Sequence, residues 1–389
     1  MDKRIYLCLA HMSGKEQGFI KEAFDTNWVV PLGPNVNAFE EELESFVGDN
    51  KKVVALSAGT AAIHLALIQL GIQSGDEVVC QSFTFCASAN PVTYLGATPV
   101  FVDSEEDTWN MSPVLLEKAI KDRMAKTGKK PKAIIPVHLY GMPAKIDEIC
   151  AIAEKYEIPV LEDAAEALGS EFNGRKCGTF GTFGALSFNG NKMITTSGGG
   201  ALVVADEAAK KQTMYYATQA REPFPYYQHE HIGYNYRMSN ICAGIGRGQM
   251  TVLDDHIAHH RHVHNLYEKA FADMEGITLM SNPDSRFNAN YWLCTILIDK
   301  ELTGFDYEEL RVTLDTKGIE TRPLWKPMHL QPVFKNNPCY IDGTSEKLFN
   351  KGLCIPAGPC VTDEDVAYIV NEIKKLIKKK QGEKLLADI

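Results

Sequence analysis

Two short stretches decide how this sequence is interpreted: residues 161–166 read LEDAAE and residues 187–192 read SFNGNK. The apolar run at 158–161 predicts a buried strand, so Asp163 falls close to the carboxyl end of that strand. In sheets covered by helices on both faces, ligands sit at these strand ends. Lys192 stands in an Asn/Gly-rich segment ahead of a run of three glycines, which predicts a lysine held close to the backbone. Asp163 and Lys192 are therefore the first candidate site residues.

Short apolar runs alternate with helical patterns around these stretches. Strands are predicted at five runs: 53–56, 77–80, 99–102, 133–137 and 158–161. Helices are predicted between them, at 60–70, 87–95, 113–124 and 146–156. Strand–helix alternation at this spacing predicts an α/β fold whose mainly parallel sheet has helices on both faces.

The pattern changes near residue 250. A long polar helix is predicted to run from there to about residue 272. The elements predicted after it are two strand-like segments and two helices: 291–298, 318–322, 307–316 and 363–380. Because about 150 residues per domain is usual, we predict a large domain at 1–250 and a smaller α+β domain at 251–389.

Composition excludes several classes of protein. Apolar residues make up 45% and charged residues 23% of the chain, which excludes a wholly disordered, collagen-like or coiled-coil protein. Lys and Arg number 40 against 50 Asp and Glu, so the formal charge is −10 and no nucleic-acid partner is predicted. The uncharged stretches 53–75 and 78–102 contain many polar residues and glycines, so we predict buried core rather than membrane spans.

The ten cysteines form no Cys-x-x-Cys pair, which argues against a zinc ribbon or a thioredoxin-type redox site. No apolar signal core follows the first four residues, MDKR. We therefore expect reduced thiols and a cytoplasmic location.

A histidine-rich segment is the main competing signal. His256, His260 and His264 recur at i, i+4 and i+8 on one helix face, a spacing that can bind zinc. Arg261 interrupts the group and no metalloprotease pattern follows. We predict a solvated helix face and no metal. The lysines at 374–380 are likewise predicted to be the solvent-facing side of the last helix.

One chemistry uses an aspartate and a lysine in this arrangement. A lysine can bind a pyridine aldehyde cofactor as an imine while an aspartate keeps the ring nitrogen protonated. A surface lysine and a helix-capping aspartate fit the same spacing, and spacing alone does not decide between the two. The stretch SAGTAA at 57–62 places backbone N–H groups at a helix N-terminus, which suits a phosphate, although simple N-capping explains it equally well.

The order of five longer motifs is more specific. They read SAGTAAIHLAL, SFTFCASANPVTYLGATPVFVD, LEDAAEALGS, SFNGNKMITTSGGG and GYNYRMSN. Together they resemble the nucleotide-sugar aminotransferases of the DegT/DnrJ/EryC1/StrS family, from about residue 13 to residue 369. Three motifs are most similar to the UDP-N-acetylbacillosamine-type (UDP-4-keto-6-deoxy-GlcNAc) transaminases, with the GDP-perosamine synthases next: LEDAAEALGS, SFNGNKMITTSGGG and ETRPLWKPMHLQPVF at 320–334.

The resemblance implies a fold type I enzyme that depends on pyridoxal 5′-phosphate. Lys192 then binds the cofactor as an imine, Asp163 pairs with the pyridine nitrogen and Phe85 stacks on the ring. Glu166 lies near the ring hydroxyl, where many members carry glutamine. The residues implied to hold the phosphate are Gly59, Thr60 and Ser187.

The resemblance also implies the substrates and the assembly. Asn235 reaches the cofactor phosphate of a neighbouring subunit, which makes a homodimer the functional unit. Five residues are implied to lie near the sugar nucleotide: Arg237, Arg322, Trp325, Lys326 and His329.

The implied reaction moves an amino group from L-glutamate to C4 of a nucleotide-linked 4-keto-6-deoxy sugar, with UDP-2-acetamido-2,6-dideoxy-4-keto-hexose as the first choice. The alternatives are a GDP-perosamine synthase-type aminotransferase, an amino-acid aminotransferase and a catalytically silent binding protein on the same scaffold. Retention of Lys192 favours transamination over the family's dehydratases, in which histidine replaces the lysine.

Overall fold

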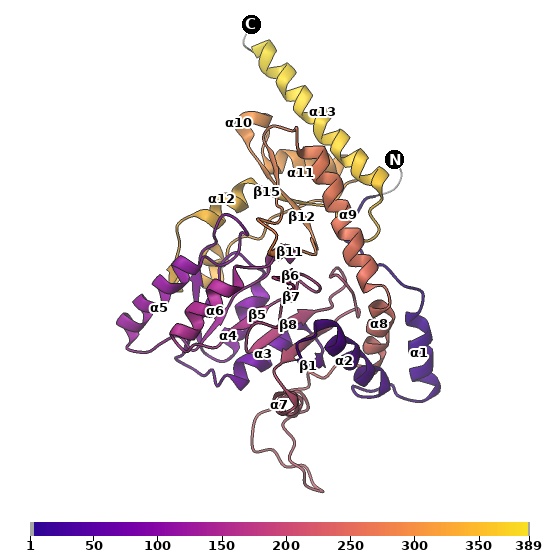
Figure 1. The fold of residues 1–389 in the computed structure, drawn as a ribbon, viewed down its shortest axis with the longest axis vertical. Coiled ribbons are helices and arrows are strands. Elements are labelled where there is room, and N and C mark those ends of the chain that lie inside the picture. Colours follow the sequence, from indigo (N-terminus) through magenta and orange to yellow (C-terminus); the bar gives the residue numbers. More distant parts are fainter. Residues whose placement is uncertain (1–3, 388–389) are drawn as a thin grey trace.

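The computed structural model describes residues 4–387 (Figure 1). Its main sheet is built from two four-stranded sheets, in the orders β1-β9-β8-β5 and β14-β3-β2-β4. Parallel bridges from Ile134 to Val160 and from Val137 to Asp163 join β4 to β5 and make the two sheets continuous. The bounds of the strands are β1 Lys52–Leu56, β2 Glu77–Gln81, β3 Thr98–Val102, β4 Ala133–Ile135, β5 Leu161–Asp163, β8 Phe183–Ser187, β9 Gly200–Val204 and β14 Cys339–Tyr340.

Every pairing in this sheet is parallel except those of β9, which runs antiparallel to both β1 and β8. The mainly parallel α/β architecture predicted from the sequence is therefore confirmed. Parallel strands need helical crossovers, and their carboxyl ends meet at one edge of the sheet.

Helices cover both faces of the sheet because its strands are apolar on both sides. On β1, Val53 and Ala55 pack into the cluster that includes α2, whereas Val54 and Leu56 pack against α3 on the opposite face. The covering helices are α2 Pro34–Val47, α5 Pro113–Thr127 and α6 Ile146–Lys155 on one face, and α3 Gly59–Gln69, α4 Asn90–Tyr94 and α7 Glu207–Ala217 on the other. Beside them, α1 Glu16–Asp25 packs on α8 Asn240–Met250.

A second, antiparallel sheet lies in the upper part of Figure 1, with the strand order β10-β12-β15-β13. Its strands are β10 Ile277–Leu279, β12 Cys294–Ile298, β13 Arg322–Pro323 and β15 Gly352–Ile355. The helices around it are α9 Leu253–Phe271, α10 Lys300–Thr303, α11 Tyr307–Thr316, α12 Thr344–Lys351 and α13 Asp363–Ala387. The small remaining elements are β6 Glu171–Phe172, β7 Arg175–Lys176, β11 Phe287–Asn288, η1 Cys86–Ser88, η2 Leu139–Gly141, η3 Met328–Leu330 and η4 Pro332–Phe334.

The predicted domain division at residue 250 falls between α8 and α9. Strand pairings cross it: β14 adds a strand to the main sheet, β11 pairs with β6, and Ile5 forms a parallel bridge with Ile319. Segments from each side of the division therefore pair with strands on the other side. The division into 1–250 and 251–389 stays a prediction about folding units.

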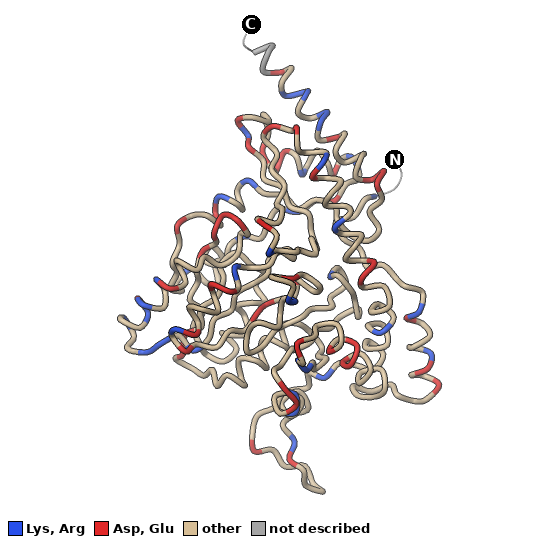
Figure 2. The backbone as a smooth tube through the Cα atoms, in the orientation of Figure 1, with Lys and Arg blue, Asp and Glu red and all other residues tan. Residues whose placement is uncertain are grey.

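Charges of both signs are interspersed along the described chain (Figure 2). On α13, Lys374, Lys375, Lys378 and Lys379 are exposed, as predicted for the solvent-facing side of the last helix, whereas Lys380 is half-buried and forms an ion pair with Glu309 at 2.6 Å. Among residues 4–387, no helix combines the length and the hydropathy that a bilayer crossing requires.

The predicted solvated face of histidines on α9 is wrong. The exposed fractions of His256, His260 and His264 are 4%, 0% and 1%. Each ring donates to a backbone carbonyl from another segment: His256 to Met193 at 3.2 Å, His260 to Tyr291 at 3.1 Å and His264 to Met280 at 2.9 Å. The three histidines were predicted to face solvent because their side chains are polar, but an imidazole that donates to a carbonyl is readily buried.

Burial of His260 predicts a specific dependence of stability on pH. Burial lowers the pKa of His260 to about 3, whereas an unfolded histidine titrates near 6.5. Between these values the unfolded chain binds a proton that the folded chain does not, so stability falls as the pH falls. From about pH 6.5 to about pH 5 the loss from this residue is about 2 kcal/mol.

Urea unfolding of the wild type and of His260→Asn, at about pH 6.5 and about pH 5, measures the contribution of His260 to the free energy of unfolding. Asparagine keeps a donor toward Tyr291 but does not titrate, so the decline in unfolding free energy between the two pH values is expected to be shallower in the variant. Equal declines in the two proteins would contradict the assignment.

Candidate active site

A cavity of about 470 Å³ opens at the carboxyl ends of the main-sheet strands. Asp163 ends β5, Ser187 ends β8, and Gly59 begins α3 three residues after β1 ends. Eight of the residues predicted from the sequence line this cavity: Gly59, Thr60, Phe85, Asp163, Glu166, Ser187, Lys192 and Trp325. The fold therefore brings together segments that are more than 200 residues apart in sequence.

Asp163 is held by donors from two sides. The Ser88 hydroxyl donates to Oδ2 at 2.6 Å, and the backbone N–H of Ala165 donates to Oδ1 at 3.2 Å. The hydroxyls of Ser88 and Thr84 lie 2.7 Å apart, so Thr84 holds the Ser88 hydroxyl in position. These contacts hold the orientation of the Asp163 carboxyl group, which lines the cavity.

The Lys192 amine lies between a carboxylate and an aromatic ring. Its Nζ is 3.4 Å from Oε1 of Glu166 and 3.8 Å from the centroid of the Trp292 ring. The other oxygen of Glu166 accepts the backbone N–H of Tyr140 at 2.7 Å. Burial raises the pKa of Glu166, and the neighbouring Lys192 charge acts in the opposite direction. Lys192 is thus a partly enclosed amine with its orientation set by neighbours.

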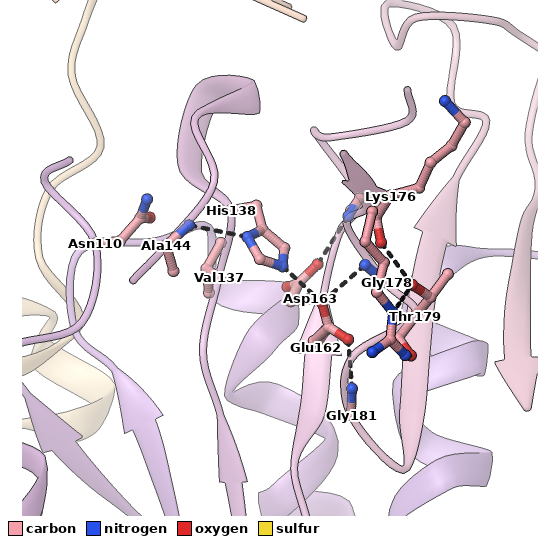
Figure 3. Close-up of polar contacts among 12 residues, drawn as sticks. Asn110, Val137, His138, Ala144, Glu162, Asp163, Lys176, Gly178, Thr179 and Gly181 are labelled. Atoms are coloured by element: carbon pink, nitrogen blue, oxygen red, sulfur yellow. Dashed lines mark hydrogen bonds and ion pairs between the residues drawn. The ribbon is translucent and has the colours of Figure 1, made fainter. Parts of the chain in front are cut away.

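Behind Asp163, the buried pair Glu162 and His138 ties three segments together (Figure 3). Oε2 of Glu162 is 2.9 Å from Nε2 of His138 and accepts the N–H of Gly178 at 2.8 Å, while Oε1 accepts the N–H of Gly181 at 2.6 Å. The amide of Ala144 donates to Nδ1 of His138 at 3.0 Å. Because an amide N–H can only donate, Nδ1 carries no proton and the ring donates from Nε2 to the carboxylate.

The same histidine also fixes Asp163 through the backbone. The His138 N–H donates to the Asp163 carbonyl at 3.1 Å, and the Asp163 N–H donates to the Pro136 carbonyl at 2.9 Å. Tyr140, which holds Glu166, follows two residues later. The Glu162–His138 pair therefore supports both carboxylates that face the cavity.

The N-terminus of α3 forms a concave backbone surface beside these side chains. A Cβ on Gly200 would lie 2.3 Å from the nitrogen of Gly59 and 2.5 Å from the carbonyl carbon of Ala58, so only glycine allows β9 to pass this close. The first N–H groups of a helix have no partner within the helix and attract anions. The hydroxyls of Thr60 and Ser187 line the same cavity.

These features fit pyridoxal phosphate. The helix N-terminus with its glycines and hydroxyls suits the phosphate, the Asp163 carboxylate suits a protonated pyridine nitrogen, and the Lys192 amine suits an aldehyde carbon. A cavity of about 470 Å³ is within the usual range for small-molecule sites.

Two predicted residues line a second cavity of about 460 Å³ instead. Asn235 is exposed there, and Arg237 is buried, where it forms an ion pair with Glu40 and donates to the carbonyl of Ala55 at 3.0 Å. The two cavities share wall residues, Ser57 and Gly198, so they adjoin.

The remaining predicted residues do not line either cavity. Arg322 and Lys326 are exposed, and Arg322 forms an ion pair with Glu320 at 2.8 Å. The Nδ1 of His329 lies 2.7 Å from the Ser82 hydroxyl, and its Nε2 lies 3.2 Å from Glu346. Of the five residues expected near a sugar nucleotide, only Trp325 reaches the first cavity.

Sequence reasoning missed Ser88, Tyr140 and Trp292. Ser88 lies inside a motif that the resemblance rests on, so its place near the site could have been noticed. Tyr140 has a φ of 55°, a conformation that non-glycine residues rarely adopt, and burial raises its pKa. Its hydroxyl accepts the backbone N–H of Trp325 at 2.8 Å. No local pattern signals Tyr140 or Trp292, because their contacts are made across the fold.

A mainly parallel sheet whose carboxyl edge holds a cavity lined by a lysine, an aspartate and a helix N-terminus is the arrangement of a pyridoxal phosphate-dependent aminotransferase of fold type I. Residues 11–374 match the DegT/DnrJ/EryC1/StrS aminotransferase family, and the chain belongs to this family. The family resemblance predicted from the motifs is confirmed, and so are the cofactor and the enzyme class.

Three known proteins illustrate the relationship. The chain is 47% identical over 393 residues, the full length of both, to a Bacillus subtilis protein named as the pyridoxal phosphate-dependent aminotransferase EpsN. It is 36% identical to the GDP-perosamine synthase of Escherichia coli O157:H7, over 95% of this chain and 97% of that one. A structure of the Streptococcus pneumoniae protein Spr1654, described as a sugar aminotransferase in its PLP form, matches with a TM-score of 0.87 at 25% identity and covers 97% of this chain and 100% of that one.

Loss of the histidine behind Asp163 is expected to destabilise the fold. His138→Ala leaves the fully buried Glu162 carboxylate one donor short, and breaking a buried pair in this way costs about 3–5 kcal/mol. Chemical unfolding of the variant measures the loss. His262→Ala is the matched control, because His262 pairs with Asp363 on the surface and such pairs contribute about 0–1 kcal/mol. Equal losses in the two variants would contradict the role given to the buried pair.

Proposed function

We propose that this chain transfers an amino group from L-glutamate to C4 of a nucleotide-linked 4-keto-6-deoxy sugar, with UDP-2-acetamido-2,6-dideoxy-4-keto-hexose as the acceptor. The observation that carries the proposal is the Lys192 amine beside Asp163 and Glu166 in one cavity. The choice of acceptor rests on the motif at 320–334 and its similarity to the bacillosamine-type branch.

The second candidate acceptor is the GDP-linked sugar of the perosamine branch. It is favoured by the similarity to several proteins named GDP-perosamine synthase, at 32–36% identity. The two acceptors differ in the nucleotide and in the substituent at sugar carbon 2, so a direct comparison of substrates separates them.

In the proposed site, each residue near the cofactor has one task. Lys192 binds the cofactor covalently, Asp163 holds a proton at the pyridine nitrogen and Phe85 covers one face of the ring. Glu166 hydrogen-bonds near the ring hydroxyl. The phosphate is held by Gly59, Thr60 and Ser187.

When bound, pyridoxal phosphate supplies an electron sink for the carbon next to the transferred nitrogen. Asp163 supports this because a negative charge beside the ring nitrogen keeps that nitrogen protonated. Lys192, once its amine is free, is a general base and acid that moves a proton between that carbon and sugar carbon 4. Phe85 and Trp325, whose ring centroids are 5.4 Å apart, form an apolar wall that limits water at the reacting atoms.

For the sugar nucleotide, we propose contacts from Arg237, Arg322, Trp325, Lys326 and His329. Arg322 and Lys326 are exposed cations in the segment that leads from β13 to Trp325 and His329, and cations of this kind bind a diphosphate. Trp325, in the same segment, lines the cavity. Arg237 shapes the adjoining cavity with its buried ion pair to Glu40.

A homodimer with shared sites is part of the proposal. Asn235 is exposed, and it lines a cavity that adjoins the first at Ser57 and Gly198. The segment ahead of it carries exposed apolar side chains: Phe224, Tyr226, Tyr227 and Ile232. Clustered exposed apolar groups mark interaction surfaces. We also propose a cytoplasmic location, consistent with ten free thiols.

Spectroscopy of the purified protein tests the reaction. We expect the cofactor absorption band to fade with L-glutamate and to return on addition of the UDP-linked 2-acetamido-4-keto sugar. Return with the GDP-linked 4-keto sugar instead would assign the perosamine-type reaction. Lys192→Ala is expected to lower turnover by at least about a thousandfold, because both the covalent attachment and the proton transfer are lost.

Mixing two inactive variants tests the shared site. Lys192→Ala subunits keep Asn235, and Asn235→Ala subunits keep Lys192, so a mixed dimer contains one intact site. After random exchange, about a quarter of the wild-type activity is expected at limiting pyridoxal phosphate. No recovery above the two separate variants, although exchange is shown by mass spectrometry of tagged subunits, would contradict a site completed by the partner.

A further inference from the structure

Trp292 lies directly against the reacting nitrogen of the proposed site. Its ring centroid is 3.8 Å from Nζ of Lys192, and its side chain is 1% exposed. The two residues come from distant segments: Lys192 from the connection between β8 and β9, and Trp292 from the residues ahead of β12. Trp292 also lines the 470 Å³ cavity.

The indole is fixed at both ends. Its Nε1–H donates to the carbonyl of Asn191, the residue before the lysine, at 2.6 Å. Its backbone N–H donates to the side-chain oxygen of Asn290 at 2.8 Å. The side-chain amide of Asn290 donates in turn to the carbonyls of Glu166 at 3.1 Å and Leu168 at 2.9 Å. The ring face is therefore positioned relative to both Lys192 and Glu166.

A lysine amine that is largely shielded from water needs other groups to replace the contacts with water that it loses. The Lys192 side chain is 14% exposed, and Oε1 of Glu166 is a loose partner at 3.4 Å. Burial raises the pKa of Glu166, and the neighbouring Lys192 charge acts against that shift. The negative face of an indole ring attracts an ammonium within about 6 Å, and the 3.8 Å separation satisfies that geometry.

We propose that Trp292 is a positioning residue for catalysis: its ring face, with Oε1 of Glu166, is the resting place of the Lys192 amine whenever that amine is free of the cofactor. The inference rests on the role proposed for Lys192 above. In transamination the amine leaves the cofactor and must return to it once per turnover. A rigid resting place within the cavity keeps the amine close to the reacting carbon, whereas a free side chain would sample many rotamers.

Fluorine NMR of the full-length protein labelled with 5-fluorotryptophan tests this placement. The chain has four tryptophans, at 28, 109, 292 and 325, and Trp292→Phe assigns the resonance of interest. Pyridoxal phosphate occupies the lysine, whereas pyridoxamine phosphate fills the same cavity and leaves the amine free. We expect the Trp292 resonance to be similar in the apo and pyridoxamine phosphate forms and displaced in the pyridoxal phosphate form.

Two substitutions of the lysine in the apoprotein serve as matched controls. Lys192→Met has a neutral side chain of similar length and is expected to displace the resonance, whereas Lys192→Arg keeps a cation and is expected to leave it closer to the wild type. A resonance that is the same with both cofactor forms, while the absorption band shows that pyridoxal phosphate has bound covalently, overturns the inference and leaves the proposed function standing. Absence of the band in wild type would overturn both.

The rate of cofactor attachment gives a second readout. Trp292→Leu removes the ring, and Trp292→Phe keeps a smaller one. We expect covalent attachment of pyridoxal phosphate to the apoprotein to slow about tenfold in the leucine variant, with partial recovery in phenylalanine, while affinity for pyridoxamine phosphate changes little. Equal weakening of both cofactor forms in the leucine variant would show a general packing role and overturn the inference.

Discussion

Supplying hydrogen-bond donors to two adjacent carboxyl groups inside the protein is the constraint on which this structure depends. Glu162 and Asp163 are neighbours on β5, and successive side chains of a strand point to opposite faces of the sheet. A buried charge without donors is very costly. Glu162 is satisfied by His138, Gly178 and Gly181, and Asp163 by Ser88 and Ala165. Apart from Ala165, which follows β5 directly, these donors come from three separate segments, and their positions fix the walls of the cavity.

The position of Lys192 is likewise set by contacts with residues from other segments. Lys192 is placed between Glu166 and Trp292, and each of these is held by backbone contacts from elsewhere. Glu166 takes the N–H of Tyr140, and Trp292 donates to the residue next to the lysine. The amine, the carboxylates and the helix N-terminus sit on separately anchored segments, so contacts within the protein fix their relative positions. Such organisation is how enzymes reduce the cost of reaching the transition state.

The parts of this arrangement that the sequence predicted are those with a local signal. Strand ends, a glycine-rich lysine segment and a helix N-terminus after β1 led to Asp163, Lys192, Gly59 and Thr60. Contacts made across the fold had no such signal, so Tyr140 and Trp292 were missed. The histidine face of α9 was misjudged for a related reason: its partners are carbonyls of Met193, Tyr291 and Met280, which only the tertiary structure supplies. The pairing of β14 with β3 of the main sheet also had no local signal in the sequence.

The central claim is that Lys192 is the residue that binds pyridoxal phosphate covalently. Borohydride reduction of the cofactor-loaded protein, followed by proteolysis and peptide mass spectrometry, tests it most directly. The account predicts a reduced pyridoxyl group on the peptide that contains Lys192, on that residue and no other. A label on a different lysine, or a fully loaded protein without any label, would contradict it.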